Sequence, residues 1–244
     1  MLIGYRSSFM QRVQEAANHG YTSVVTGTVK IEKYNNLYRK FNAMYDVDMQ
    51  KSKRSRQKAK GISLAKFLAH PEEGDMVRWV LMCTSGTGTF FEEEKRAIIP
   101  AKKIELFGQY RLTRETTKRH GKAVWTFHLT TEYKNTVKKL VHSYVHHKND
   151  AGLRKIIHET NQLIPFSGVR QDLYEIHKHI RHEWHRYRGK SDMPELPFIR
   201  YHRRLATSPV HADNVIRRMQ RTGETALEAA RNIAQNRKVK PKPA

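Results

Sequence analysis

A change in hydrophobic period near residue 130 constrains the fold of this chain most. Before it, stretches rich in β-branched residues alternate with segments of helical spacing; Tyr21–Ile31, reading YTSVVTGTVKI, is a predicted strand. Gly27 in its middle indicates a bulge or a close approach of another group to the backbone. From Thr131 onward, apolar residues recur at helical spacing. The pattern predicts an α+β fold, with a mixed α/β N-terminal half that contains a β-hairpin and an all-helical C-terminal half.

The hairpin is the clearest local signal. Residues 109–117 and 123–130 alternate between apolar and polar, and a short loop containing Gly121 joins them. We expect a hairpin over residues 109–130. Its tip carries Lys118, Arg119 and Lys122, and a basic tip of this kind can enter a groove of nucleic acid or can simply face water.

Three regions are expected along the chain. Residues 1–130 form an α+β domain, residues 131–205 a helical region, and residues 206–244 two short helices followed by a basic tail. Within the first region, KSKRSRQKAK at residues 51–60 has six cations and no acid, and like charges this close disfavour a buried segment. We therefore predict a solvated basic loop whose cations contact phosphate: Lys51, Lys53, Arg54, Arg56, Lys58 and Lys60.

An amphipathic stretch at residues 174–188 is predicted to form a helix that Gly189 ends. On a helical projection one face is apolar and is expected to pack on the rest of the helical half: Leu173, Ile176, Ile180, Trp184 and Tyr187. The opposite face is basic and aromatic and is expected to be exposed: Tyr174, Lys178, Arg181, His182, His185 and Arg188. The ordinary alternative is a helix whose charges simply face water.

The charge balance separates these two interpretations. The chain has 46 Lys and Arg against 23 Asp and Glu, a net charge of +23, and such an excess attracts polyanions. No run of about 18 apolar residues is present, and the first ten residues lack a signal peptide's apolar core. Cys83 alone excludes a disulfide framework within one chain. We expect an intracellular protein, cytoplasmic or nucleoid-associated, or nuclear in a eukaryote.

The clustered histidines could in principle bind a metal ion. The densest group is His177, His179, His182 and His185, but HEWH is not the HExxH pattern of zinc enzymes. Cations stand between these histidines and would repel a metal ion, so an anion-binding face that gains charge below about pH 6.5 is the better interpretation. The sequence therefore predicts no metal, no cofactor and no catalytic residue.

One enzymatic alternative stays open. Asp75 followed by Glu93, Glu94 and Lys95 has the form of a magnesium-dependent nuclease site, in which acids hold the metal that activates water. The acids from Glu92 onward are more simply explained as the start of a helix, where the dipole favours negative charge.

The best-supported function is non-catalytic nucleic-acid binding. The basic loop, the hairpin tip, the face of the 174–188 helix and Arg200, Arg203 and Arg204 would neutralise phosphates. Tyrosines among these cations could stack on exposed bases: Tyr174, Tyr187 and Tyr201.

Duplex DNA is favoured over RNA because the short signatures of RNA-binding modules are missing. An accessory factor of replication, DNA transfer or another mobile-DNA process would fit this profile. The second alternative is an RNA- or ribosome-associated structural protein. The oligomeric state is not predicted.

Overall fold

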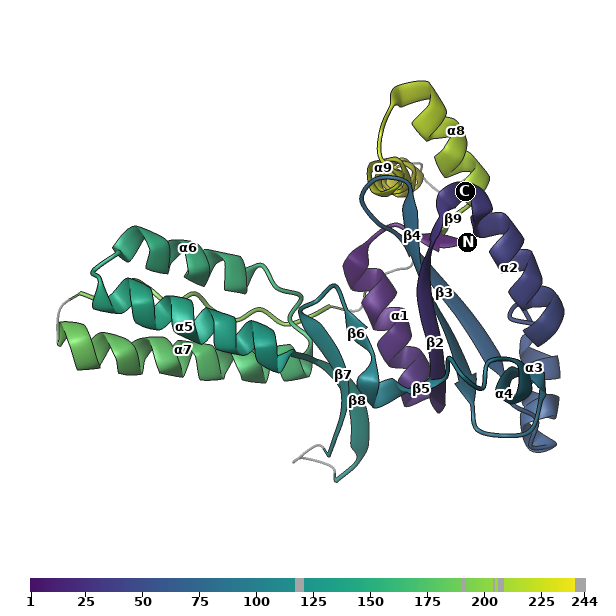
Figure 1. Cartoon of the computed structure of the whole chain (residues 1–244), viewed down its shortest axis with the longest axis horizontal. Coiled ribbons are helices and arrows are strands. Elements are labelled where there is room, and N and C mark those ends of the chain that lie inside the picture. The colour runs from purple at the N-terminus through teal and green to yellow at the C-terminus, as the bar shows by residue number, and fades with distance from the viewer. Residues whose placement is uncertain (117–120, 190–191, 204, 206–208, 240–244) are drawn as a thin grey trace. The chain divides into compact units, whose positions relative to one another are not determined.

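The chain folds into two compact units (Figure 1). The computed structural model describes residues 1–116, 121–189, 192–203, 205 and 209–239. Residues 1–101 and 204–244 belong to one unit, the terminal unit, and residues 102–203 belong to the other, the central unit. Helices and antiparallel sheets occur side by side, which confirms the α+β class.

The terminal unit is built on a four-stranded antiparallel sheet in the order β3-β4-β2-β5. Tyr21 of β2 pairs with Thr84 of β4, and Ala65 of β3 pairs with Cys83, so the start of β2, the end of β4 and the start of β3 share one end of the sheet. The elements of this unit are β1 (Leu2–Ile3), α1 (Arg6–Asn18), β2 (Tyr21–Lys30), α2 (Ile31–Tyr45), α3 (Lys51–Ala59), β3 (Ala65–Pro71), β4 (Met76–Thr84), α4 (Thr89–Glu93), β5 (Ile99–Pro100), β9 (Pro209–Val210), α8 (Ala212–Thr222) and α9 (Ala226–Val239).

Helices cover both faces of this sheet: α1 lies on one and α2 on the other (Figure 1). Under α2, Phe41 packs edge-on against Phe67 and Trp79, with ring centroids 5.4 Å and 5.3 Å away. A Cβ on Gly27 would lie 2.8 Å from Cζ2 of Trp79. The glycine in the middle of β2 is therefore explained by a close approach, that of the indole ring.

The two ends of the chain fold together. β1 pairs with β9 in antiparallel register, Leu2 opposite Val210. Val210, Val215 and Ala230 are buried in one cluster with Leu2 and Tyr34. The two predicted C-terminal helices are present as α8 and α9, but they complete the core of the terminal unit instead of forming a separate region.

The prediction of a loop at residues 51–60 is wrong, because Lys51–Ala59 is the helix α3. Lys, Arg, Gln and Ala are good helix formers, and the helix distributes its cations around its axis instead of crowding them. Arg56 and Lys58 also lie in the last turn, where the helix dipole favours positive charge. None of the α3 residues is buried, so the solvated character that the sequence predicted is present.

The central unit joins a small sheet to three helices. The sheet has the antiparallel order β6-β7-β8, and the predicted hairpin is its β7–β8 pair, with Thr113 opposite Thr126. The tip residues Lys118 and Arg119 lie outside the described residues. The elements are η1 (Ala101–Lys103, at the boundary), β6 (Glu105–Leu106), β7 (Tyr110–Thr116), β8 (Ala123–Leu129), α5 (Thr131–His146), α6 (Asp150–Asn161) and α7 (Ser167–Arg188).

The hairpin belongs with the helices because α7 packs directly on β8. A Cβ on Gly168, in the first turn of α7, would lie 2.4 Å from Nε2 of His128 and 2.6 Å from the carbonyl oxygen of Phe127. The buried Asp172 carboxylate accepts the Leu129 N–H at 2.7 Å. These contacts cross the expected boundary at residue 130, and the compact units divide at residue 101 instead.

The apolar face of α7 is buried as predicted. Leu173, Ile176, Ile180 and Trp184 are each at most 2 % exposed. The prediction is wrong for Tyr187, which is 36 % exposed at the end of the helix and packs its ring edge-on against His142 and His146.

Candidate nucleic-acid interface

The helix α3 divides its cations between two opposite faces. Lys51, Arg54 and Lys58 are three and four residues apart and lie on one side of the helix. Lys53, Arg56 and Lys60 are displaced by about half a turn and lie on the other side. The first group faces a hollow in the protein surface whose lining contains no Asp or Glu.

That hollow, the α3 pocket, lies at the end of the sheet where β2 and β3 begin and β4 ends. Figure 1 shows α3 beside this end. The pocket has a volume of about 410 Å³, and no Asp or Glu lines it. Its lining residues are Ala16, His19, Tyr21, Lys51, Arg54, Ser55, Lys58, Leu64, Lys66 and Thr84.

Two of the lining cations, Arg54 and Lys66, are partly buried and near enough for their charges to interact. The Nε of Arg54 is buried and has no hydrogen-bond partner among the described residues, while one of its terminal nitrogens donates to the Met49 carbonyl at 3.4 Å. Burial lowers the pKa of Lys66, and the nearby Arg54 charge lowers it further. A bound anion would relieve this repulsion and stabilise both charges.

A hydroxyl and an imidazole also line the α3 pocket. The Ser55 hydroxyl lies on the exposed side of α3, one residue after Arg54. The imidazole of His19 stands at the end of α1, with its Nδ1 2.6 Å from the Glu15 carbonyl oxygen, so Nδ1 carries the proton. Guanidinium, ammonium and hydroxyl donors around one concave site are the groups that bind phosphate oxygens.

His19 and Lys66 were not among the predicted site residues. Neither has a local signal: His19 reads as a helix end, and Lys66 is one cation in an otherwise apolar strand. They reach the pocket only because β2 and β3 start at the same end of the sheet. The strand pairing therefore creates a site that spacing along the chain cannot reveal.

The cations on the far side of α3 have other surroundings. Lys53 forms an ion pair with Asp46, 2.7 Å between Nζ and Oδ2. Arg56 and Lys60 are exposed and have no carboxylate partner within the part of the chain that the structure describes. Substitutions of Arg56 and Lys60 can therefore serve as controls for substitutions of the cations that face the α3 pocket.

The predicted basic face of α7 is largely present. Tyr174 is 53 % exposed, and the side chains predicted beside it also face water: Lys178, Arg181, His182 and His185. Arg188 is the exception, because its side chain is only 17 % exposed and makes two hydrogen bonds to Asp150, at 3.0 Å and 3.3 Å. Its guanidinium also lies 4.5 Å from the Trp184 ring centroid. The expectation that Arg188 is free for phosphate is wrong, because this residue fastens α7 to the start of α6.

A buried carboxylate organises the histidines at this end of α7. Glu183 accepts from Nδ1 of His142 at 2.6 Å and lies 3.3 Å from Nδ1 of His182. Burial alone would raise the pKa of Glu183, but the hydrogen bonds from the two histidines hold it below its usual range. Within the described ranges, no three His, Cys, Asp or Glu side chains are arranged to hold a metal ion.

Other predicted contacts are exposed where the structure describes them. Lys122 is exposed at the start of β8, and Arg200, Tyr201 and Arg203 are exposed in the segment at residues 192–203. Arg204 lies outside the described residues. None of these side chains lines the α3 pocket.

The candidate nuclease residues are far apart. Asp75 precedes β4 and lies 3.7 Å from Lys30, whereas Glu93 ends α4, which follows β4. The Ile31 N–H at the start of α2 donates to the Asp75 carbonyl, whereas Tyr45 at the end of α2 donates to Glu94, so the 15 residues of this helix separate the two acids by roughly 20 Å. Asp75, Glu93 and Lys95 therefore cannot share a magnesium ion within one chain, and we do not propose nuclease activity.

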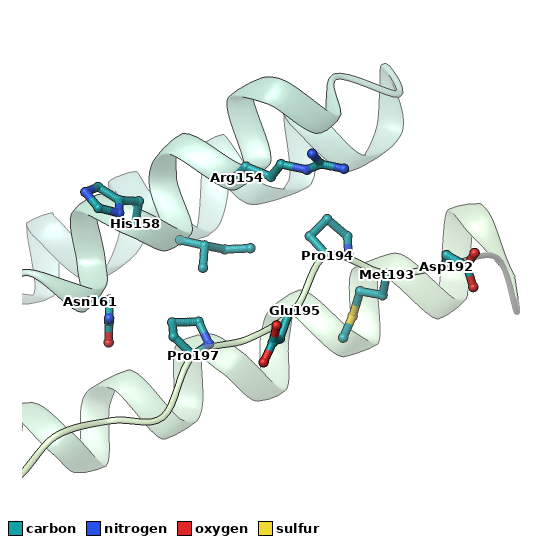
Figure 2. Close-up of a pocket in the computed structure, with 9 residues that line it drawn as sticks. Arg154, His158, Asn161, Asp192, Met193, Pro194, Glu195 and Pro197 are labelled. Carbon is teal, nitrogen blue, oxygen red and sulfur yellow. The ribbon is translucent and has the colours of Figure 1, made fainter.

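Another pocket lies between α6 and the segment at residues 192–197 and has a volume of about 580 Å³. Figure 2 shows Arg154 and His158 on the α6 side, facing Pro194 and Pro197 across the pocket. Glu195 and Asp192 belong to its lining as well. The mixture of both charges offers a phosphate no net attraction, so this pocket is a weaker candidate than the α3 pocket.

A second pocket with arginines lies between α8 and α9, with a volume of about 570 Å³. Arg218 there is neutralised by Glu224, 2.5 Å and 2.8 Å between their atoms. Arg217 donates to the Asn214 side chain at 2.9 Å. Arg217 and Arg218 therefore already have side-chain partners, whereas no carboxylate lines the α3 pocket.

Comparisons with known proteins found nothing similar. No family model, curated protein or solved structure matches the chain. None of the helices in the described ranges combines the length and apolar character that crossing a bilayer requires.

Proposed function

We propose that this protein binds nucleic acid through phosphate contacts and that the α3 pocket is its principal phosphate site. The observation that carries the proposal is the charge of the pocket. Its lining contains no carboxylate, and four cations line it beside the His19 imidazole: Lys51, Arg54, Lys58 and Lys66. In a chain of net charge +23, such a site attracts a polyanion strongly.

The exposed cations of α7 and of residues 192–203 support the proposal as additional phosphate contacts. Lys178, Arg181 and Arg200 are exposed side chains whose charges face solvent. Exposed cations of this kind position a nucleic acid without reading its sequence. We expect such a protein to act as a basic accessory factor in a DNA process, as the composition suggested, with no catalytic role of its own.

The test compares two double variants of α3 that lose the same charge. Lys51→Gln with Lys58→Gln alters the face toward the pocket, and Arg56→Gln with Lys60→Gln alters the face away from it. Because each lost phosphate contact costs about 0.7 kcal/mol, the first double variant should bind DNA roughly 10-fold more weakly. The second should change affinity by less than about 2-fold, since it removes only distant, screened charge.

Fluorescence anisotropy at one salt concentration, with magnesium present, measures these affinities on duplex DNA, a single strand and a structured RNA. Equal losses in the two double variants would contradict a specific role for the α3 pocket. Binding of structured RNA alone would favour the RNA-associated alternative. Thermal unfolding of each variant checks that both remain folded.

A further inference from the structure

Two large aromatic side chains stand out from the segment at residues 192–203. Phe198 is 70 % exposed and Tyr201 is 68 % exposed, with ring centroids 6.2 Å apart. Isolated exposed aromatic rings are ordinary, but two adjacent rings that face solvent expose apolar area that folding normally buries. The segment has no helical or strand structure in its described part, so irregular backbone presents these rings.

Buried neighbours fix the direction of these rings. Ile199 is 2 % exposed, and the His202 ring packs on Phe166 with centroids 4.7 Å apart. Burial lowers the pKa of His202, as expected for an imidazole that packs as a neutral ring. Because Ile199 and His202 anchor the segment, Phe198 and Tyr201 are held outward.

An arginine from α7 completes the arrangement. The guanidinium of Arg170 lies 3.6 Å from the centroid of the Tyr201 ring, and its Nε is buried without a hydrogen-bond partner among the described residues. We call Arg170, Phe198 and Tyr201 the aromatic platform. Tyr174 lies one helical turn further along the same face of α7 and is also exposed.

The charge around the platform is positive. Arg200 is exposed between the two rings in sequence, and Arg203 is exposed just beyond them. The ring faces can stack on planar bases, and the arginines can pair with the phosphates that connect those bases. A hydrophobic partner protein would not need these cations, whereas a polynucleotide strand uses both features.

We propose that the aromatic platform stacks the bases of an unpaired DNA strand. The inference rests on the proposed function and narrows it from nucleic acid in general to single-stranded DNA. It departs from the duplex that composition favoured, because the faces of bases inside a duplex already stack on one another and are closed to protein rings. Stacking accepts every base, so the site should have little sequence preference.

The experiment separates base contacts from phosphate contacts. Anisotropy measures binding of the full chain to three fluorescent ligands: a 15-nucleotide oligothymidine, an abasic strand with the same number of phosphates, and a 15-base-pair duplex. Phe198→Ala with Tyr201→Ala should weaken oligothymidine binding about 10- to 100-fold, because stacking contributes about 1–3 kcal/mol per base. Abasic binding should change less than 2-fold.

Matched variants keep the result interpretable. Tyr187, which the sequence also suggested for base stacking, instead packs its ring against His142 and His146. Tyr187→Ala removes a ring that is not part of the platform and should leave oligothymidine binding within about 2-fold. Phe198→Trp with Tyr201→Trp retains large rings and should retain affinity, and quenching of the added indole fluorescence by oligothymidine but not by the abasic strand would report stacking directly.

Several results would overturn the inference. These are equal affinity of the wild type for oligothymidine and the abasic strand, equal losses on both strands in the alanine variant, or a platform-dependent preference for the duplex. A 10-fold preference for oligouridine over oligothymidine would overturn the assignment to DNA. Failure to bind any of these ligands would contradict the proposed function itself. Equal binding of oligothymidine and the abasic strand would contradict only the stacking of bases on the platform.

Discussion

At the scale of single residues, the neighbours of a charged side chain decide its role in this protein. Arg181 and Arg188 lie two turns apart on α7, yet the first faces water and the second is bound by Asp150. Helical projection of the sequence placed Lys178, Arg181 and His185 on an exposed face correctly. It could not identify Arg188 as paired, because its partner lies 38 residues away and is brought near only by the packing of both α6 and α7 on α5.

His70 gives a test at this scale. It is 1 % exposed, donates from Nδ1 to the Ile3 carbonyl at 2.7 Å, and stacks on Phe9. Burial lowers its pKa to about 4, with smaller contributions from nearby arginines. Between pH 6.5 and about 4 the unfolded chain binds a proton at this site and the folded chain does not, so the free energy of unfolding should decrease as pH falls, by on the order of 3 kcal/mol.

Urea unfolding of the wild type and of His70→Gln at pH 7, 5.5 and 4.5 measures this effect. The variant should be less stable at pH 7 and should lose less stability than the wild type on acidification, because glutamine does not titrate. Parallel pH profiles for the two proteins would show that His70 does not supply the slope.

At the scale of elements, the close packing of α7 on the hairpin gives the next test. Gly168→Ala places a methyl group 2.4 Å from Nε2 of His128 and 2.6 Å from the Phe127 carbonyl oxygen, which is backbone. Because the backbone cannot yield cheaply, we expect the free energy of unfolding to fall by about 1–3 kcal/mol despite alanine's better helix propensity. Gln171→Ala, at an exposed position of the same helix, is the control and should stay within about 0.5 kcal/mol of the wild type. A Gly168→Ala variant as stable as the wild type would mean that α7 and β8 are not packed this tightly.

Strong periodic signals predicted elements well, and charge alone did not. The β7–β8 hairpin and the buried face of α7 follow from alternation and helical spacing, and the structure confirms both. The α3 helix was taken for a loop because a run of cations looked self-repelling, although its residue types favour a helix. The six cations were predicted to contact phosphate as one group; only the helix shows that Lys51 and Lys58 face a pocket and that Arg56 and Lys60 do not.

At the scale of the whole molecule, one compact unit is made of two segments that are far apart in the sequence. The C-terminal helices complete the core that Leu2 and Tyr34 begin, while the intervening residues form a unit of their own. Changes in the hydrophobic period of the sequence mark where helices replace strands. They cannot show that the N-terminal strand β1 pairs with the C-terminal strand β9. The α3 pocket, likewise, depends on Lys66 and His19 meeting α3 through long-range strand pairing.

The whole-molecule charge and the α3 pocket make one joint prediction about salt. The dependence of log K on log salt concentration for oligothymidine binding should be linear, with a slope of about −0.7 for each phosphate contacted. Lys51→Gln with Lys58→Gln should make that slope shallower by roughly 1.4, and Arg56→Gln with Lys60→Gln should leave it near the wild-type value. Affinity that does not fall with salt, or the same change of slope in both double variants, would contradict phosphate binding in the α3 pocket.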